Sequence, residues 1–461
     1  MRYVSTRGAA PDVDFEGALL TGLAPDGGLY VPERWPALPE IGAASGYAQV
    51  AAAVIAPFVE GVFSHDEILG FARDVYGDFR HESVAPLRPL AEGEMLLELF
   101  WGPTLSFKDY ALQLVGKLLD QILRRRGERV TVIGATSGDT GSAAIDALRD
   151  LEAIEVVMLH PEGRVSDVQR RQMTTVASSN IHNVAVRGTF DDCQDLVKAM
   201  FSDDDLRAEV RPAAVNSINW ARIMSQIVYY VWAAHEIGAL DDRVTFAVPT
   251  GNFGNVFSAY GARQMGVPID QLIVGNNANH GLSDFLTSGS LPIGEVVPTH
   301  APAMDIQVPS NLERLLFDVF ERRGEVLASL MNDYRVAGSL DVLSVQMTGV
   351  RDLFDAGYST DDEILTVIRD LYHETGVVVD PHTATGIAAG RAGRRDRDHQ
   401  IVFVATAHPA KFPEAIQSAL HLEPDLPDDL DDLMDREERF EIVDNDLEEV
   451  ERIVRRVAPS K

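Results

Sequence analysis

The stretch RVTVIGATSGDTGSAAIDALRDL (residues 129–151) joins a β-rich run, a loop of small and hydroxyl-bearing residues, and a run with helical character. β-branched residues fill its first part, which is typical of a strand. Apolar residues at spacings of three and four fill its last part, as expected for an amphipathic helix. The stretch therefore predicts a strand, a loop and a helix in direct succession.

The same alternation continues on both sides of this unit. Further strands are predicted at 95–100, 154–161, 183–189, 244–250, 271–277 and 401–407, with helical patterns between most of them. Strands that alternate with helices of this length imply parallel sheets with helices on both faces. The sequence therefore predicts an α/β fold with two parallel-sheet domains, a smaller one at 93–215 and a larger one at 216–461. A mainly helical region, 1–92, precedes them. The acidic segment 422–456 reads as solvated surface ending in a charged helix.

Composition excludes several classes of protein. A chain of 461 residues is too long for one compact core, and a net charge of −31 disfavours binding to nucleic acid and to anionic membranes. No apolar run has the length of a membrane span, and residues 1–17 lack the apolar core of a signal peptide. Cys193 is the only cysteine, so no disulfide can form within the chain. We expect a cytoplasmic protein without nucleic-acid or membrane partners.

The segment GNFGN links a predicted strand to a predicted helix. Its glycines allow the backbone to approach an anion, and the helix start adds N–H groups and a positive dipole. No Gly-Lys-Ser/Thr follows, so the segment is not a Walker loop. It predicts a phosphate site, with a tight turn at a helix start as the alternative; its members are Gly251, Asn252, Phe253, Gly254 and Asn255.

The loop TSGDTGS (136–142) has the same position between strand and helix. Its hydroxyls and the N–H groups of the helix start suit a carboxylate or a phosphate. It lacks the Gly-x-Ser-x-Gly order of a nucleophile elbow. An N-capped helix is the alternative.

Lysine is scarce in this chain. It occurs only at positions 108, 117, 198, 411 and 461, and arginine supplies the other basic residues. Arginine stays protonated at neutral pH and cannot form a Schiff base. Lys108 follows a Gly-Pro-Thr turn and the apolar Phe107, where partial desolvation would make its amine nucleophilic. The alternative is an exposed lysine at a helix start.

Two further segments carry polar groups at element ends. Thr406 places a hydroxyl at the end of a predicted strand, where α/β proteins bind ligands, and His408 beside it is more readily explained as structural. A second set could hold an oxyanion or simply cap a helix: Asn216, Ser217, Asn219 and Arg222. Together with Lys108 and GNFGN, these groups describe a ligand with an aldehyde, a phosphate and a ring nitrogen. That ligand is pyridoxal phosphate, and no metal is required.

Across nearly its whole length the sequence resembles the threonine synthase family, among the pyridoxal-phosphate enzymes of the tryptophan-synthase-β type. The family's motifs occur in order: YVSTRG at 3–8, GLAPDGGLYVP at 22–32, GPTLSFKD at 102–109, TSGDTG at 136–141, NSINWARI at 216–223, GNFGN at 251–255 and TAHPAKF at 406–412. The first two and the last point to the longer, microbial and fungal kind. The resemblance implies the fold type II architecture of these enzymes.

The resemblance also implies roles for single residues. Lys108 would carry the cofactor as a Schiff base and shuttle protons, and Asp139 would lie near the cofactor's 3′ oxygen. The 251–255 loop would hold the cofactor phosphate and Thr406 the pyridine nitrogen. The substrate carboxylate would bind Thr136, Ser137 and Thr140. The substrate phosphate would bind Asn216, Ser217, Arg222 and Asn252.

The implied reaction converts O-phospho-L-homoserine and water to L-threonine and phosphate, by γ-elimination and β-addition of water. One departure from the family is Trp101, where histidine is expected; an indole cannot take up a proton near neutral pH. Two rivals stay open: a pyridoxal-phosphate dehydratase or phospholyase that releases 2-oxobutyrate, and a non-catalytic nucleotide-binding α/β protein. A monomer and a homodimer are both compatible with the sequence.

Overall fold

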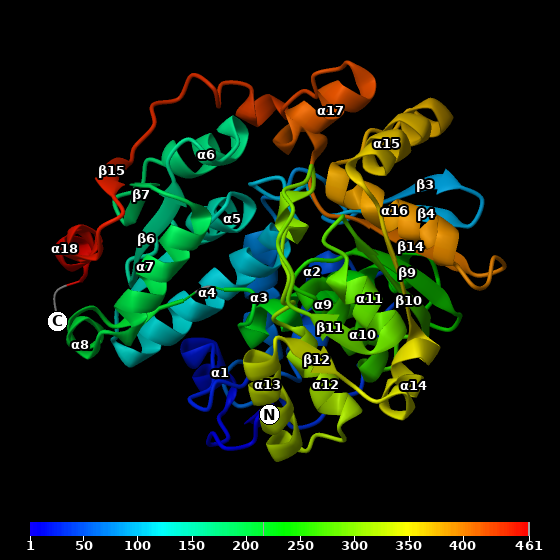
Figure 1. Ribbon diagram of the computed structural model, residues 1–461, viewed down its shortest axis with the longest axis horizontal. Coiled ribbons are helices and arrows are strands. Elements are labelled where there is room, and N and C mark those ends of the chain that lie inside the picture. Colours follow the sequence, from blue (N-terminus) through cyan, green and yellow to red (C-terminus); the bar gives the residue numbers. More distant parts are fainter. Residues whose placement is uncertain (215, 460–461) are drawn as a thin grey trace. The chain divides into compact units, whose positions relative to one another are not determined.

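The computed structural model describes residues 1–214 and 216–459, so Val215, the predicted end of the second domain, and Lys461 lie outside the described residues. The chain forms two compact units (Figure 1). Unit 1 comprises residues 1–107 and 217–424, and unit 2 comprises residues 108–216 and 425–461. None of the described helices is both long and apolar enough to cross a membrane.

Unit 2 contains a five-stranded sheet in the order β15-β7-β6-β5-β8, and all its neighbouring strands are parallel. Helices α4, α5 and α6 pack together as one group, and α7, α8 and α18 as another. The elements are β5 (Val130–Ala135), β6 (Ile154–Pro161), β7 (Ile181–Arg187), β8 (Pro212–Ala213), β15 (Glu441–Asp444), α4 (Lys108–Arg126), α5 (Asp139–Leu148), α6 (Asp167–Thr174), α7 (Phe190–Ser202), α8 (Asp204–Val210), η3 (Asp428–Leu430) and α18 (Leu447–Val457).

Unit 1 is built on a six-stranded sheet in the order β13-β10-β9-β14-β4-β3, parallel except for the antiparallel β3–β4 pair. Helix α16 packs on four of these strands, α15 packs on α16, and α17 packs on α15 (Figure 1). The strands are β3 (Leu87–Ala91), β4 (Glu94–Glu98), β9 (Val244–Pro249), β10 (Ile269–Asn276), β13 (Phe354–Tyr358) and β14 (Gln400–Ala405).

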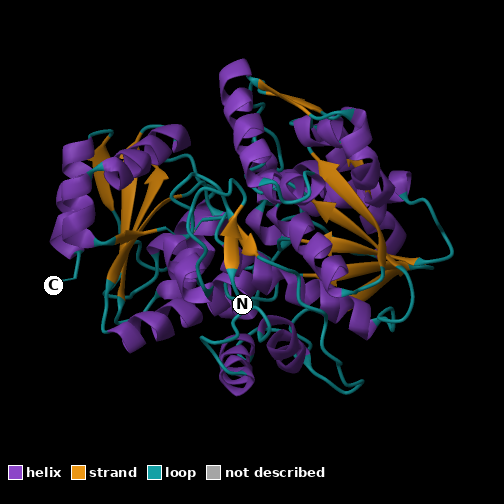
Figure 2. Ribbon diagram, turned by 90° about the horizontal axis from the view of Figure 1, so that it is seen from below, coloured by secondary structure: helices purple, strands orange, loops and turns teal. Residues whose placement is uncertain are grey.

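The remaining elements of unit 1 are helices and two short antiparallel strand pairs, coloured by type in Figure 2. The pairs are β1 (Tyr3–Ser5) with β2 (Tyr30–Pro32), and β11 (Ser290–Pro292) with β12 (Ser339–Asp341). The helices are α1 (Phe15–Thr21), α2 (Tyr47–Ile55), α3 (His65–Tyr76), α9 (Trp220–Glu236), α10 (Gly254–Met265), α11 (Gly281–Ser288), η1 (Pro302–Met304), α12 (Leu312–Val319), α13 (Gly324–Ala337), α14 (Ser344–Leu353), α15 (Asp361–Thr375), α16 (Pro381–Gly393), η2 (Pro409–Lys411) and α17 (Pro413–Leu420).

The observed units differ from the predicted division at 1–92, 93–215 and 216–461. Within the predicted region 1–92, α2 packs on α9 and β3 pairs with β4 at the edge of the six-stranded sheet, so both elements belong to unit 1. The acidic tail is not only solvated surface. Its strand β15 extends the sheet of unit 2 beside β7, and apolar residues of α18 enter the same core.

Candidate functional site

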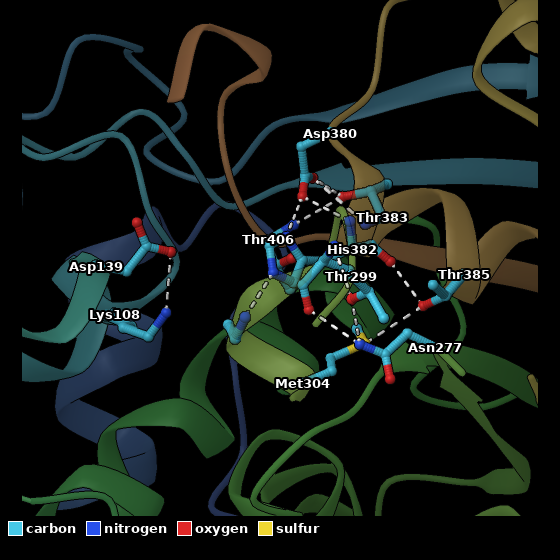
Figure 3. A network of polar contacts seen from close by, with 12 residues as sticks. Lys108, Asp139, Asn277, Thr299, Met304, Asp380, His382, Thr383, Thr385 and Thr406 are labelled. Atoms are coloured by element: carbon cyan, nitrogen blue, oxygen red, sulfur yellow. Dashed lines mark hydrogen bonds and ion pairs between the residues drawn. The ribbon is translucent and has the colours of Figure 1, made fainter. Parts of the chain in front are cut away.

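Lys108 begins α4 and is almost fully buried within unit 2. Its Nζ lies 3.1 Å from Oδ2 of Asp139, the first residue of α5 (Figure 3). The other carboxylate oxygen, Oδ1, accepts a hydrogen bond of 2.7 Å from Nε2 of Gln169 on α6. A cation at a helix start opposes the helix dipole, and the Asp139 carboxylate offsets this. The exposed lysine considered as the alternative is therefore excluded.

The loop between β5 and α5 is organised by Thr136. Its buried hydroxyl oxygen accepts hydrogen bonds from the N–H groups of Gly138 (3.0 Å) and Gly141 (2.9 Å). Gly138 has a φ of 144°, a backbone conformation that favours glycine. Thr136 thus shapes the loop. No hydrogen bond is found for the hydroxyls of Ser137 and Thr140 among the described residues.

The GNFGN segment forms a turn between β9 and α10 in unit 1. Phe253 has a φ of 63°, and no side chain caps the start of the helix. The N–H groups at that start consequently face outward from the helix without a side-chain acceptor. A Cβ on Gly251 would lie 2.7 Å from the carbonyl oxygen of Ala303, so the turn is closed to any larger residue. A tight glycine turn with uncapped N–H groups fits a phosphate.

Two buried side chains near this turn have unused hydrogen-bond donors. Arg222, on the first turn of α9, is 4% exposed, and its Nε and Nη1 have no partner among the described residues. Burial lowers the pKa of Arg222 to about 10. Asn255 accepts hydrogen bonds from the hydroxyls of Tyr229 (2.6 Å) and Tyr230 (2.7 Å), while its Nδ2 is also unpartnered. Buried donors without an acceptor are costly, which favours an anion as their partner.

The other predicted oxyanion residues have different settings. Asn216 is exposed and belongs to unit 2, whereas Ser217 is half-buried in unit 1. The carbonyl oxygen of Ser217 accepts a hydrogen bond from Nδ2 of Asn311, which also bonds the carbonyl of Asn252 (3.1 Å). Asn219 caps α9 and is therefore structural.

The residues before Lys108 form a loop that is fastened to the end of β14 within unit 1. The N–H of Phe107 donates to the carbonyl oxygen of Thr406 (2.8 Å), and the N–H of His408 donates to that of Leu105 (3.0 Å). The buried Nζ of Lys411 donates to the carbonyl oxygen of Thr104 (2.6 Å). The motifs GPTLSFKD and TAHPAKF, far apart in sequence, therefore support one another.

Thr406 itself is 6% exposed, and no hydrogen bond is found for its hydroxyl among the described residues. His408 caps η2, since its Nδ1 accepts the N–H of Ala410 at 3.2 Å. The structural explanation of His408 is thus supported. Trp101 is structural too, because its indole N–H donates to Oε2 of the buried Glu98 at 3.0 Å.

Sequence reasoning missed a buried polar network next to Thr406. Asp380, His382 and Thr383, at the start of α16, are hydrogen-bonded to one another, and Thr383 also bonds the N–H of Thr406 (Figure 3). A Pro after Asp380 marks a helix start in the sequence, but nothing local indicates that Thr383 bonds Thr406, 23 residues away. Gln169 was missed for the same reason. Among the described residues, no cluster of His, Cys, Asp or Glu could hold a metal ion.

Comparisons with known proteins cover the whole chain. The model of "Threonine synthase N terminus" matches residues 2–76, that of "Pyridoxal-phosphate dependent enzyme" matches 95–331, and that of "Threonine synthase, C-terminal" matches 383–454. A threonine synthase of Pseudomonas aeruginosa is 49% identical over 98% of each chain.

Solved structures agree with this. The structure of pyridoxal-phosphate-bound threonine synthase from Brucella melitensis has a TM-score of 0.97 at 45% identity and covers all of both chains. Yeast threonine synthase has a TM-score of 0.93 at 34% identity, covering 99% of this chain and 98% of its own. The predicted α/β architecture with fold type II parallel sheets is confirmed. The chain belongs to the threonine synthase family of pyridoxal-phosphate-dependent enzymes.

Proposed function

We propose that the chain converts O-phospho-L-homoserine and water to L-threonine and phosphate, with pyridoxal phosphate as its cofactor. The observation that carries this proposal is Lys108, a buried amine held against the Asp139 carboxylate at a helix start. Such an amine is suited to a Schiff base and to proton transfer. The resemblance of GPTLSFKD (102–109) to the family's motif implies the same role for Lys108.

The residues of the chain fit the cofactor group by group. The uncapped start of α10 and the glycines of the 251–255 loop offer N–H groups to its phosphate. The free hydroxyl of Thr406 offers a neutral partner to its ring nitrogen. A hydroxyl leaves that nitrogen less readily protonated than a carboxylate would, which disfavours side reactions such as transamination. When bound, pyridoxal phosphate supplies an aldehyde for amines and a ring that stores negative charge.

We assign the substrate's two anionic groups to different residues. Arg222 has buried, unpartnered donors and suits the substrate phosphate, with Asn216, Ser217 and Asn252 as further candidates. The open hydroxyls of Ser137 and Thr140 suit the substrate carboxylate. Thr136 contributes mainly by shaping that loop.

Lys108 also carries out the proton transfers in this proposal. Its Nζ removes the proton from the substrate's α carbon and returns protons later in the reaction. Asp139 Oδ2 lies at 3.1 Å, where it accepts a hydrogen bond from the protonated amine. Gln169, bonded to the other oxygen of that carboxylate, keeps Asp139 oriented.

The products separate this function from the nearest rival. The purified protein is incubated with O-phospho-L-homoserine, and threonine, 2-oxobutyrate and phosphate are quantified. We expect threonine and phosphate in equal amounts. Mainly 2-oxobutyrate would identify a phospholyase or dehydratase instead, because those enzymes share the cofactor residues.

Chemical trapping separates it from a nucleotide-binding protein. We expect a yellow preparation that loses its colour on reduction with isotopically labelled borohydride and then carries the label at Lys108. The Lys108→Ala variant should be inactive, and Lys117→Ala, on the same helix, is the matched control. A colourless protein, or full activity of Lys108→Ala, contradicts the proposal.

We also propose a cytoplasmic location and a monomer or homodimer as the assembly. The single, buried Cys193 thiol suits a reducing compartment. Sedimentation of the holoenzyme distinguishes the two assemblies.

A further inference from the structure

Asp380 is a fully buried carboxylate at the N-cap of α16 in unit 1. Its Oδ1 accepts hydrogen bonds from the N–H of His382 (2.9 Å) and from Nδ1 of His382 (2.8 Å). Its Oδ2 accepts from the N–H and the hydroxyl of Thr383. Bonds to backbone N–H groups are ordinary helix capping. The two side-chain donors are not required for a cap.

Thr383 links Asp380 to Thr406 by two hydrogen bonds. Because an ionised carboxylate only accepts, the Thr383 hydroxyl must donate to Asp380, which leaves its oxygen to accept from elsewhere. It accepts the N–H of Thr406 at 3.1 Å. Strand β14 ends at Ala405, so this N–H has left the sheet, and Thr383 takes the place of a strand partner. This hydrogen bond fixes the backbone of Thr406 and thereby positions the side-chain hydroxyl of the same residue.

His382 makes the equivalent connection to the phosphate loop. Its Nδ1 faces Asp380, and its Nε2 accepts the N–H of Ala303 at 3.1 Å, so the proton sits on Nδ1. The carbonyl oxygen of Ala303 is the atom that a Cβ on Gly251 would approach to 2.7 Å. The dashed lines in Figure 3 show the contacts that join the Asp380 carboxylate to His382 and to Thr383.

We propose that Asp380 is a positioning residue for the cofactor. Through Thr383 it holds the Thr406 hydroxyl, and through His382 it holds the segment around Ala303 against the Gly251 turn. The inference rests on the proposed function, since it assigns these two groups to the ring nitrogen and the phosphate of one cofactor. The Asp380 carboxylate, bonded to both His382 and Thr383, sets the distance between the Thr406 hydroxyl and the Gly251 turn. Asp380 acts through these two neighbours, because it is fully buried and its carboxylate is hydrogen-bonded to His382 and Thr383.

Paired variants on one helix test this. Thr383→Val removes the hydroxyl and keeps the shape, leaving the N–H of Thr406 unsatisfied. Thr385→Val is the matched control, because Thr385 is equally buried on α16 but donates to the carbonyl oxygen of His382. We expect Thr383→Val to weaken pyridoxal phosphate binding to the apoprotein about tenfold and Thr385→Val less than about twofold. Equal losses in both variants would overturn the proposal.

A double variant shows whether Thr383 acts through Thr406. In a Thr406→Val background, Thr383→Val should add less than about twofold, whereas independent effects would multiply. A full tenfold addition contradicts the proposal. If Thr406→Val alone leaves binding and the visible absorption of the bound cofactor unchanged, the assigned role of Thr406 in the proposed function is wrong. If only Thr383→Val is silent, the positioning role alone fails.

A rescue variant and the absorption spectrum of the bound cofactor distinguish a positioning role of Thr383 from a general effect on protein stability. Thr383→Ser retains the hydroxyl, and we expect it to restore binding to within about threefold. Thr383→Val should also shift the absorption of the bound cofactor, which a uniform loss of stability would not do. Thr383→Ala removes the same hydroxyl and replaces the valine variant if that one does not fold. An unshifted spectrum with a lowered melting temperature would reduce Thr383 to a structural residue.

Discussion

Arg222 and Arg314 are two fully buried arginines in unit 1 with opposite surroundings. Arg314 donates to the carbonyl oxygens of Tyr30 and Ile218 and to the side chain of Asn311. Arg222 leaves Nε and Nη1 without partners among the described residues. Burial lowers the pKa of Arg222 to about 10 and that of Arg314 to about 9. Arg314 therefore stabilises the fold, whereas Arg222 is available to an anion.

Methionine substitutions should separate the two roles. For Arg222→Met we expect the KM for O-phospho-L-homoserine to rise roughly tenfold or more, with the free energy of unfolding unchanged or slightly higher, because an uncompensated buried charge is removed. For Arg314→Met we expect a loss of about 3–5 kcal/mol in that free energy, because buried carbonyls lose their donor. Urea unfolding and steady-state kinetics provide the measurements. Equal destabilisation of both variants would contradict this division.

Trp101 offers a second test at a single residue. Replacing it with phenylalanine removes the indole N–H from the buried Glu98, although Nε of Arg88 still bonds that carboxylate at 2.6 Å. We expect Trp101→Phe to lower the free energy of unfolding by about 1–2 kcal/mol and to leave threonine formation within about twofold. A large loss of kcat without a loss of stability would assign Trp101 to the chemistry instead.

At the scale of elements, η2 depends on a neutral histidine. Burial first, and Arg80 second, lower the pKa of His408 from 6.5 to about 4, and its Nδ1 must stay unprotonated to accept the N–H of Ala410. Below pH 6.5 the unfolded chain takes up a proton that the folded chain does not. The contribution of neutral His408 to the free energy of unfolding is therefore fully present above pH 6.5. It is lost as the pH falls from 6.5 to about 4, and the total loss is about 3 kcal/mol.

His408→Asn tests this, because asparagine retains an acceptor for the cap and does not titrate. Unfolding by urea is measured for both proteins across this range. We expect the difference in free energy of unfolding to shift in favour of the variant as the pH falls from 6.5 to 4. Parallel curves would show that His408 does not set this pH dependence.

Long elements could be predicted from sequence, and short ones could not. Strands such as β5 and β9 and helices such as α4 and α9 have strong local patterns. Strands β1, β2, β11 and β12 have three residues each and exist only through partners distant in the chain. The site divides in the same way. Lys108 and the 251–255 turn belong to local motifs, whereas Asp380 reaches Thr406 only through the folded structure.

At the scale of the whole molecule, the acidic tail shows how composition can mislead. Its charge suggested a solvated segment, but Val450, Ile453 and Val454 have the spacing of a buried helix face and lie in the core of unit 2. Glu438 fastens the preceding segment to α6, bonding Nε of Arg170 at 2.8 Å and the hydroxyl of Thr174 at 2.8 Å. The tail is thus an integral part of the fold of unit 2, although most of unit 1 separates it in sequence from the rest of that unit.

Ile453→Ala should consequently weaken residues that are more than 250 positions away in sequence. Removing a buried isoleucine side chain from this core should cost about 2–5 kcal/mol. Hydrogen exchange measured by mass spectrometry should show faster exchange in β5, β6 and β7 as well as in α18, because one core unfolds as one cooperative unit. Arg452→Ala, one residue earlier on the exposed face of α18, is the control and should leave exchange unchanged. If Ile453→Ala accelerates exchange only within 441–457, the tail frays by itself and does not share the stability of the sheet.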